Sequence, residues 1–273
     1  MYKLITLLII IILAISLNSC CCVNSFKDTQ AYSNASDAKT YEDNGDHEKA
    51  LKYYKEAVKY APDNAYLYNN ICWDLTINKY FDDARPYCEK ALLLNPDDPY
   101  ILDSMGYLLV ETGEVDEGIK YYEKSIKIDP SKELHYIHLA DAYIDKGDFN
   151  KAFLYVDRAL EVNSDYYFAY YKIGLYNSFL KKSYLAIENY KKAINLNSNY
   201  TRAYYKLATE LEKIGKQDEA REYLEQVAEI ENDLIEKKKE IESKNRAVQS
   251  VYEDLQEFGQ NPYKKVYEEI RGE

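Results

Sequence analysis

Glycine and proline are scarce in this 273-residue chain, which has 9 of the first and 6 of the second. No alternation of apolar and polar residues recurs along the chain, so a fold built from strands is disfavoured and an all-helical protein is expected. Basic residues are also too few to balance the acidic ones, and the formal net charge is −12. A nucleic-acid-binding protein needs a basic face, so we expect no nucleic-acid partner.

The chain also lacks the usual signatures of an active site. It has no glycine-rich phosphate loop, no nucleophile elbow and no strongly spaced set of metal ligands. His135 and His138 are three residues apart on one predicted helix, but two ligands without a third are a weak metal signal. A solvated helix face is the better interpretation of this pair. We therefore expect no enzyme activity, no bound metal and no cofactor.

What the chain does have is a pattern that returns every 34 residues. Between residues 31 and 234 a small residue recurs at this interval, as Ala50, Ala84, Gly118, Ala152, Ala186 and Ala220. Six copies in register predict a repeat solenoid, in which each unit contacts only its neighbours. The copies, which we call repeats 1 to 6, are residues 31–64, 65–98, 99–132, 133–166, 167–200 and 201–234.

Each copy divides into two predicted helices around a turn. Four of the turns contain a glycine, which supplies the left-handed residue that ends a helix: Gly45, Gly113, Gly147 and Gly215. Short polar residues follow and are expected to cap the second helix: Asp82, Asp116, Asn150 and Asp218.

Repeats 3 and 4 carry the pattern most clearly. Repeat 3 has Leu102, Met105, Gly106, Leu109, Gly118, Tyr122 and Pro130, and repeat 4 has Tyr136, Leu139, Ala140, Tyr143, Ala152 and Ala159. This pattern resembles the tetratricopeptide repeat, over about three quarters of the chain. The resemblance implies an all-α, right-handed superhelical solenoid of antiparallel helix pairs, with six repeats and a C-terminal helical cap. Repeat 1 has Asn34 and Asp37 where apolar residues belong, so we expect it to form a polar end cap.

The first 19 residues have the features of a signal peptide. Residues 4–17 are almost entirely Leu and Ile. As a helix they would span about 21 Å, short of the roughly 30 Å hydrocarbon core of a membrane. The triplet Leu-Asn-Ser before Cys20 resembles a bacterial lipoprotein signal. That resemblance implies that Cys20 is the first mature residue and carries acyl chains such as palmitate, with residues 20–30 as a lipidated tether. An ordinary secretory signal or a short anchor is the alternative.

Cys72 and Cys88 occupy positions 8 and 24 of repeat 2, on helices that the pattern pairs. Export would place them in an oxidising compartment, where a disulfide is stable. Two buried thiols that replace small hydrophobic residues are the alternative, and the sequence leaves both open.

The C-terminal segment is predicted to be helical. Residues 216–258 contain no glycine or proline, and an apolar residue recurs every seven positions. We expect a long helix whose apolar stripe covers the exposed end of the solenoid, then a break at residues 259–262 and a short helix over 263–271. Residues 235–273 would thus form the capping helices.

In tetratricopeptide proteins the first helix of each repeat lines a concave groove. By that resemblance the peptide-binding groove would present Tyr66, Asn69, Asn70, Trp73, Tyr100, Asp103, Tyr107, His138, Asp141, Phe168, Tyr171, Lys172, Arg202, Tyr205 and Lys206. Arg202 and Lys206 match the basic pair of the family's carboxylate clamp, but the other clamp positions differ, so a full clamp is absent. Together with Lys172 they predict a site for an acidic or C-terminal peptide segment, although solvated lysines are an equal alternative.

These features predict a lipid-anchored adaptor in the bacterial cell envelope, facing the periplasm or the exterior. Its groove would bind a peptide or protein partner, as an assembly or scaffolding factor does. A structural protein that self-associates through the C-terminal helix is one alternative, and an envelope enzyme of unrecognised type is another. The sequence does not name the partner or the oligomeric state.

Overall fold

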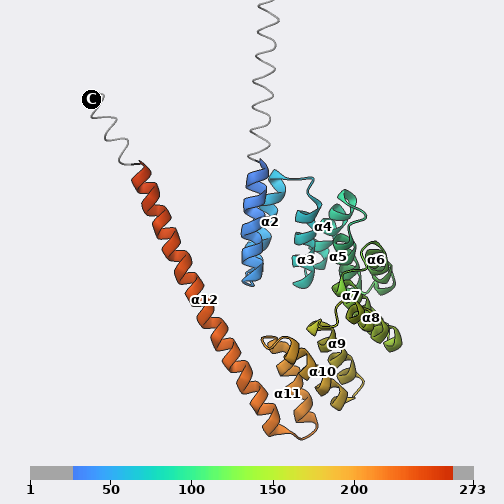
Figure 1. The fold of residues 1–273 in the computed structure, drawn as a ribbon. Coiled ribbons are helices and arrows are strands. Elements are labelled where there is room, and N and C mark those ends of the chain that lie inside the picture. The colour runs from blue at the N-terminus through green and yellow to red at the C-terminus, as the bar shows by residue number, and fades with distance from the viewer. Residues whose placement is uncertain (1–26, 261–273) are drawn as a thin grey trace, which may run out of the picture. The chain divides into compact units, whose positions relative to one another are not determined.

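The computed structural model describes residues 27–260, and all regular structure within them is helical. Figure 1 shows the helices in chain order. The predicted signal peptide, the lipidation site Cys20 and the short helix over 263–271 lie outside the described residues. The first helix of repeat 1 covers residues 27–43.

The helices follow the 34-residue period of the sequence. The other first helices are α3 (Ala65–Ile77), α5 (Pro99–Glu111), α7 (Glu133–Asp145), α9 (Tyr167–Phe179) and α11 (Thr201–Lys213). The second helices are α2 (His47–Tyr60), α4 (Phe81–Leu94), α6 (Val115–Ile128), α8 (Phe149–Val162), α10 (Ser183–Leu196) and α12 (Gln217–Gln260). Helix starts are 34 residues apart in both series, which confirms the all-α solenoid of helix pairs.

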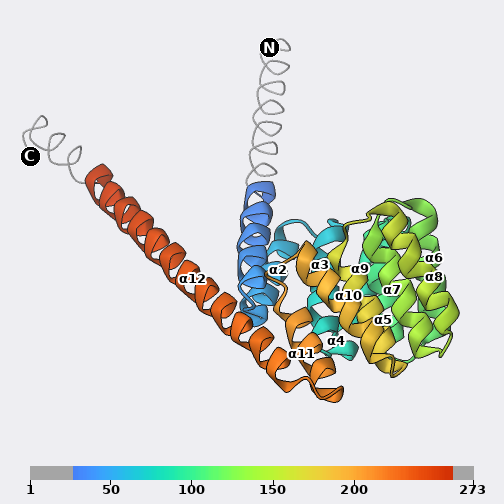
Figure 2. The same ribbon diagram turned by 60° about the horizontal axis from the view of Figure 1, so that its bottom comes forward.

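The chain divides between Ala169 and Tyr170 into an N-terminal part and a C-terminal part. In the N-terminal part, α5 contacts the first helices on both sides, α3 and α7. Two second helices contact the first helix of their own repeat and that of the next: α4 contacts α3 and α5, and α6 contacts α5 and α7. Figure 2 shows the helices of repeats 3 and 4 side by side. Side chains from three successive first helices can therefore meet on one face.

Small residues allow the close approach of paired helices. Ala50, Ala84, Ala152 and Ala186 are completely buried, as the repeat pattern predicts. In repeat 3 a Cβ atom added to Gly106 would lie only 2.8 Å from the ring of Tyr122. Such an overlap would force the two helices apart, so the small residues set the spacing within each pair.

The turns confirm the predicted role of glycine, because Gly45, Gly113, Gly147 and Gly215 all have positive φ. Repeats 2 and 5 place a lysine there instead, and Lys79 and Lys181 adopt φ values of 65° and 59°. A residue with a Cβ atom is strained in this conformation.

The predicted capping residues are wrong in register. Asp82 and Asp116 lie inside the first turns of α4 and α6, where a negative charge still favours the positive end of the helix dipole. The true N-cap positions lie two residues earlier, because the turn after the left-handed residue is shorter than expected. Asp148 holds that position for α8, and its carboxylate accepts a hydrogen bond from the backbone N–H of Lys151. Asn150 and Asp218 likewise fall inside α8 and α12.

A disulfide joins Cys72 of α3 to Cys88 of α4, with the two Cα atoms 5.0 Å apart. Both residues are buried, so the bond links the two helices of repeat 2 within their core. Of the two alternatives left open by the sequence, the structure contains the disulfide.

The last helix continues far beyond repeat 6. α12 is a single helix of 44 residues that includes Gly259, so the predicted break does not begin there. Ala220 and Val227 of α12 are buried, and the helix contacts α11. Residues 231–237 are exposed, with Leu234 and Ile235 exposed by 48% and 51%. Over this stretch α12 does not cap the repeats; capping by the residues beyond it stays a prediction. Within the described residues, no helix is both long and apolar enough to span a membrane.

Candidate protein-binding face

The predicted groove residues of repeats 2 to 4 lie on α3, α5 and α7, all in the N-terminal part. Trp73 and Tyr107 occupy the same position in successive repeats. Their ring centroids are 5.0 Å apart and their planes are tilted by 37°. The imidazole of His138, on the next repeat, lies 5.9 Å from Trp73 and 5.7 Å from Tyr107. We call these three residues the aromatic cluster; Trp73 and Tyr107 are half-buried, and the side chain of His138 is 10% exposed.

A buried carboxylate lies beside the aromatic cluster. Nδ1 of His138 is 2.7 Å from Oδ2 of Asp103, and Asp103 is only 5% exposed. A carboxylate can only accept hydrogen bonds, so the ionised Asp103 requires a proton on Nδ1 of His138. The other oxygen, Oδ1, is buried and has no hydrogen-bond partner among the described residues. Oδ1 of Asn69, at the same position one repeat earlier, is in the same situation.

Two further carboxylates act on this region, Glu111 at the end of α5 and Asp141 on α7. Burial raises the pKa of the Tyr107 hydroxyl, and the charges of Glu111 and Asp141 raise it further. Burial also raises the pKa of Tyr122 well above its ordinary value, with Asp103 and Asp141 adding to the effect. Glu111 and Asp141 therefore act on both tyrosine hydroxyls, and Asp103 acts on that of Tyr122. Glu111 holds position 13 of repeat 3, a groove position in the family, but it was not among the predicted groove residues.

Two tyrosines extend this face toward the start of the first helices. Tyr66 and Tyr100 are exposed by 53% and 48%. The hydroxyl of Tyr66 donates to Oδ2 of Asp98 at 2.7 Å, while Oδ1 of Asp98 caps α5. The ring of Tyr100 meets His135 edge-on, with 5.5 Å between centroids. Of the other predicted residues in these helices, Asn69 and Asn70 are half-buried.

The two histidines of α7 are engaged separately. Nδ1 of His135 lies 2.9 Å from Oγ of Ser125, whereas His138 contacts Asp103. Burial lowers the pKa of His135. In the part of the chain that the structure describes, no three potential ligands among His, Cys, Asp and Glu converge to hold a metal ion.

The predicted basic strip lies in the C-terminal part. Arg202 and Lys206 are exposed and Lys172 is half-buried. Tyr205 is 46% exposed, and its hydroxyl donates to Oε1 of Glu231 at 3.1 Å. Glu231 belongs to α12, so the sequence pattern of the first helices gave no signal for it.

Tyr171 does not flank this strip as an open ring. It is 7% exposed, and its ring packs 5.1 Å from Tyr200 and 5.9 Å from Tyr190. The expectation that Tyr171 offers its ring to a ligand is therefore wrong, because neighbouring tyrosines of the same part cover it. Phe168, in the N-terminal part, is half-buried with its ring 6.0 Å from that of Tyr166.

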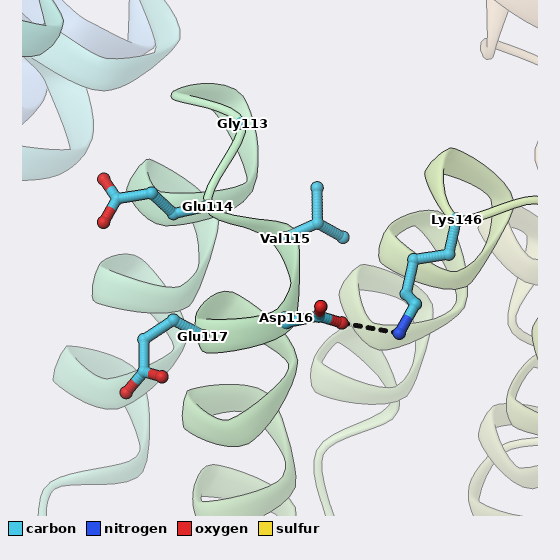
Figure 3. A pocket seen from close by; sticks show the side chains of 6 residues that line it. All are labelled: Gly113, Glu114, Val115, Asp116, Glu117 and Lys146. Atoms are coloured by element: carbon cyan, nitrogen blue, oxygen red, sulfur yellow. Dashed lines mark hydrogen bonds and ion pairs between the residues drawn. The ribbon is translucent and has the colours of Figure 1, made fainter.

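A pocket of about 470 Å³ lies elsewhere, at the turns of repeats 3 and 4. Its lining residues are Gly113, Glu114, Val115, Asp116, Glu117 and Lys146. Figure 3 shows Lys146 pointing to Asp116, with 2.5 Å between Nζ and Oδ1. This contact lowers the pKa of Asp116 and raises that of Lys146. The pocket has no aromatic ring, and its one cation is taken up by Asp116.

The repeats are those of a known family. A tetratricopeptide repeat model matches residues 38–64, and a second model of the same description matches residues 100–132, 136–166, 169–200 and 201–234. These segments make up more than half of the chain, which belongs to the tetratricopeptide repeat family. The matched segments leave out repeat 2, which holds the disulfide and Trp73.

Solved structures share the fold at low identity. PilW, a widely conserved type IV pilus biogenesis factor, matches with a TM-score of 0.60 and 19% identity over 72% of this chain and 91% of that one. Pseudomonas aeruginosa PilF matches with a TM-score of 0.56 and 14% identity, over 76% and 99%. A tetratricopeptide repeat protein of Thermus thermophilus matches with a TM-score of 0.55 and 22% identity, over 61% of this chain and 91% of that one. No curated protein sequence matches the chain.

Proposed function

We propose that this protein is an adaptor that binds a protein partner on the first-helix face of its repeats. The observation that carries this proposal is the aromatic cluster of Trp73, Tyr107 and His138, which brings together rings from three repeats, two of them half-buried. Half-buried aromatic residues with polar neighbours are typical of interface hot spots. The side chains of this face offer contact area and charge, and we propose binding without catalysis.

A photo-crosslinking residue tests this proposal directly. Placed at Tyr66 or Tyr100, which are exposed about two helical turns before Trp73 and Tyr107 on the same helices, it should capture a defined partner in the native envelope. Placed at exposed Asp157, on a second helix, it should not capture the same partner. Trp73→Ala should abolish the crosslink from Tyr100 while the protein stays folded. Capture from both faces alike, or capture that survives Trp73→Ala, would contradict the proposal.

We also propose that Cys20 anchors the protein to an envelope membrane. The lipoprotein-like triplet before Cys20 and the apolar stretch over residues 4–17 support this assignment. Mass spectrometry of the purified protein should find an acylated Cys20 as the N-terminal residue. Cys20→Ser should leave an unlipidated precursor. An intact Met1 on the wild-type protein in the membrane fraction would refute the anchor.

Self-association through α12 is the second candidate function. The exposed side chains of Leu234 and Ile235 favour it, because apolar residues on an exposed helix surface can pack against a second copy. Sedimentation should then give a dimer or larger species for the full chain. Leu234→Glu with Ile235→Glu should give a monomer. A monomeric wild-type chain at high concentration would exclude this function.

A further inference from the structure

The aromatic cluster lies in a part of the first-helix face that carries no lysine or arginine at the groove positions. In the tetratricopeptide family the groove side chains lie near positions 2, 5, 6, 9, 12 and 13 of each repeat. At these positions in repeats 2 to 4 there is no lysine or arginine, whereas four carboxylates occupy them: Asp103, Glu111, Asp141 and Asp145. In repeats 5 and 6 the same positions carry four cations, Lys172, Arg202, Lys206 and Lys213, against one carboxylate, Glu212. The N-terminal repeats therefore present charge of the opposite sign to the C-terminal ones.

Asp103 provides independent support for a ligand that donates hydrogen bonds at this face. Its Oδ2 contacts His138, but its buried Oδ1 has no donor among the residues that the structure describes. Oδ1 of Asn69 is likewise buried and unpaired. A buried acceptor without a donor costs free energy. Both atoms lie on the helices that carry Trp73 and Tyr107.

The aromatic rings of Trp73 and Tyr107 provide a second feature that favours a cation, besides the carboxylates. The faces of tryptophan and tyrosine attract cations, most strongly when water is partly excluded. Trp73 and Tyr107 are half-buried, and the pKa of the Tyr107 hydroxyl is raised by burial and then by Glu111 and Asp141. Glu111 is exposed and Asp141 is half-buried, so both carboxylates are at least partly accessible to solvent.

We propose that Trp73 and Tyr107, with Asp141, Glu111 and the buried charge of Asp103, bind an arginine side chain of the partner. Arginine fits better than lysine, because its planar guanidinium stacks on aromatic rings and presents five N–H donors to carboxylates. This assignment rests on the proposed adaptor function and gives it a ligand chemistry. It differs from the acidic segment predicted for the basic strip, which lies in the other part of the chain.

Trp73 reports on this site by itself, because it is the only tryptophan in the chain. The full chain in detergent is titrated with an end-blocked peptide, glycine-arginine-leucine-arginine-glycine, while the tryptophan fluorescence is measured. The same peptide with citrulline in place of arginine keeps the shape and removes the charge. We expect a saturable change with the arginine peptide, at least about tenfold weaker binding of the citrulline peptide, and weakening by salt.

Variants that remove carboxylates test whether Glu111 and Asp141 are responsible for arginine-peptide binding. Glu111→Gln with Asp141→Asn should weaken arginine-peptide binding by about tenfold. The matched control, Glu117→Gln with Asp157→Asn, removes the same charge from exposed positions of second helices and should change binding less than about twofold. Circular dichroism should show both variants folded, and Trp73 fluorescence of each should start from the wild-type value.

Several results would overturn the inference: equal binding of the arginine and citrulline peptides, no fluorescence change with either, or equal loss in the two double variants. The crosslinking experiment separates this failure from that of the adaptor function. If Trp73→Ala abolishes partner capture while arginine and citrulline peptides bind alike, the adaptor function stands and the arginine assignment fails. If no partner is captured on this face, the adaptor function fails whatever the peptides do.

Discussion

Nδ1 of His138 lies 2.7 Å from Oδ2 of Asp103, and this contact joins the first helices of repeats 4 and 3. Both side chains are at least nine-tenths buried. The pair is therefore a buried polar contact between neighbouring repeats. Its stability contribution depends on both members, because either one alone leaves a polar group buried without its partner.

Removing His138 should destabilise the N-terminal repeats strongly. His138→Ala leaves the Asp103 carboxylate buried without its hydrogen bond, which costs roughly 3–5 kcal/mol. In an Asp103→Asn background the same change should cost much less, because no charge is left behind. Urea unfolding of the four proteins in this double-mutant cycle measures the coupling. Additive effects would mean that the contact contributes nothing of its own.

Acidification should destabilise the fold through His135. Burial lowers the pKa of His135, so the unfolded chain binds a proton at a higher pH than the folded one. Stability is then complete above the unfolded pKa of about 6.5 and falls as the pH drops through it toward the folded pKa. The groups around it are Asp103, His138, Asp129 and Lys132.

His135→Gln tests this effect, since glutamine can still donate to Oγ of Ser125, whose hydroxyl donates to the carbonyl of Pro99. We expect the melting temperature of the variant to depend less on pH between 7 and 5 than that of the wild type. Equal pH dependence of both proteins would show that groups other than His135 dominate the acid response.

The repeat register should be visible in a pair of neighbouring substitutions. Ala152 is completely buried between the helices of repeat 4, so Ala152→Leu should overpack that contact and cost about 1–3 kcal/mol. Lys151 is exposed, and Lys151→Leu should change the stability by less than about 0.5 kcal/mol. Thermal unfolding compares the two variants. Equal melting temperatures would contradict the packing described for Ala152.

Most of the fold could be predicted from the sequence, because repetition amplifies weak local signals. One buried alanine says little, but Ala50, Ala84 and Ala152 at a constant interval specify a helix contact in every repeat. The prediction was wrong where it depended on a single residue outside the repeated pattern. Gly259 continues α12, because a single glycine costs a helix only about 1 kcal/mol.

The candidate site was harder to predict for a related reason. The sequence placed Asp103 and His138 on one face, but not in contact, because contacts between repeats depend on how far neighbouring helices are rotated and shifted. The same is true of Tyr171, which two neighbouring tyrosines cover. The partner of Tyr205, Glu231, lies on α12 and outside the groove pattern altogether.

The disulfide should stabilise repeat 2 measurably. Cys72 and Cys88 are 16 residues apart, and closing a loop of about this size stabilises a protein by roughly 3 kcal/mol, mainly through the unfolded chain. Cys72→Ala with Cys88→Ala should lower the melting temperature under oxidising conditions. A reductant should lower that of the wild type and leave the double variant unchanged. A reductant effect of the same size in both proteins would contradict this role.

The basic strip of the C-terminal part should contribute electrostatic attraction for an acidic segment of the partner. Arg202 and Lys206 are exposed and one helical turn apart on α11, so a carboxylate between them would contact both. Tyr205, beside them, already donates its hydroxyl to Glu231, and this carboxylate offsets part of the strip's positive charge.

Arg202→Ala with Lys206→Ala should therefore weaken capture of the partner and reduce its dependence on salt concentration. Lys181→Ala with Lys182→Ala, at exposed positions of the repeat 5 turn, is the matched control for the loss of two charges. Pull-down of the crosslinked partner at low and high salt measures both effects. If capture survives the loss of Arg202 and Lys206 but is abolished by Trp73→Ala, the lysines and arginines are only solvated surface, and recognition belongs to the N-terminal repeats.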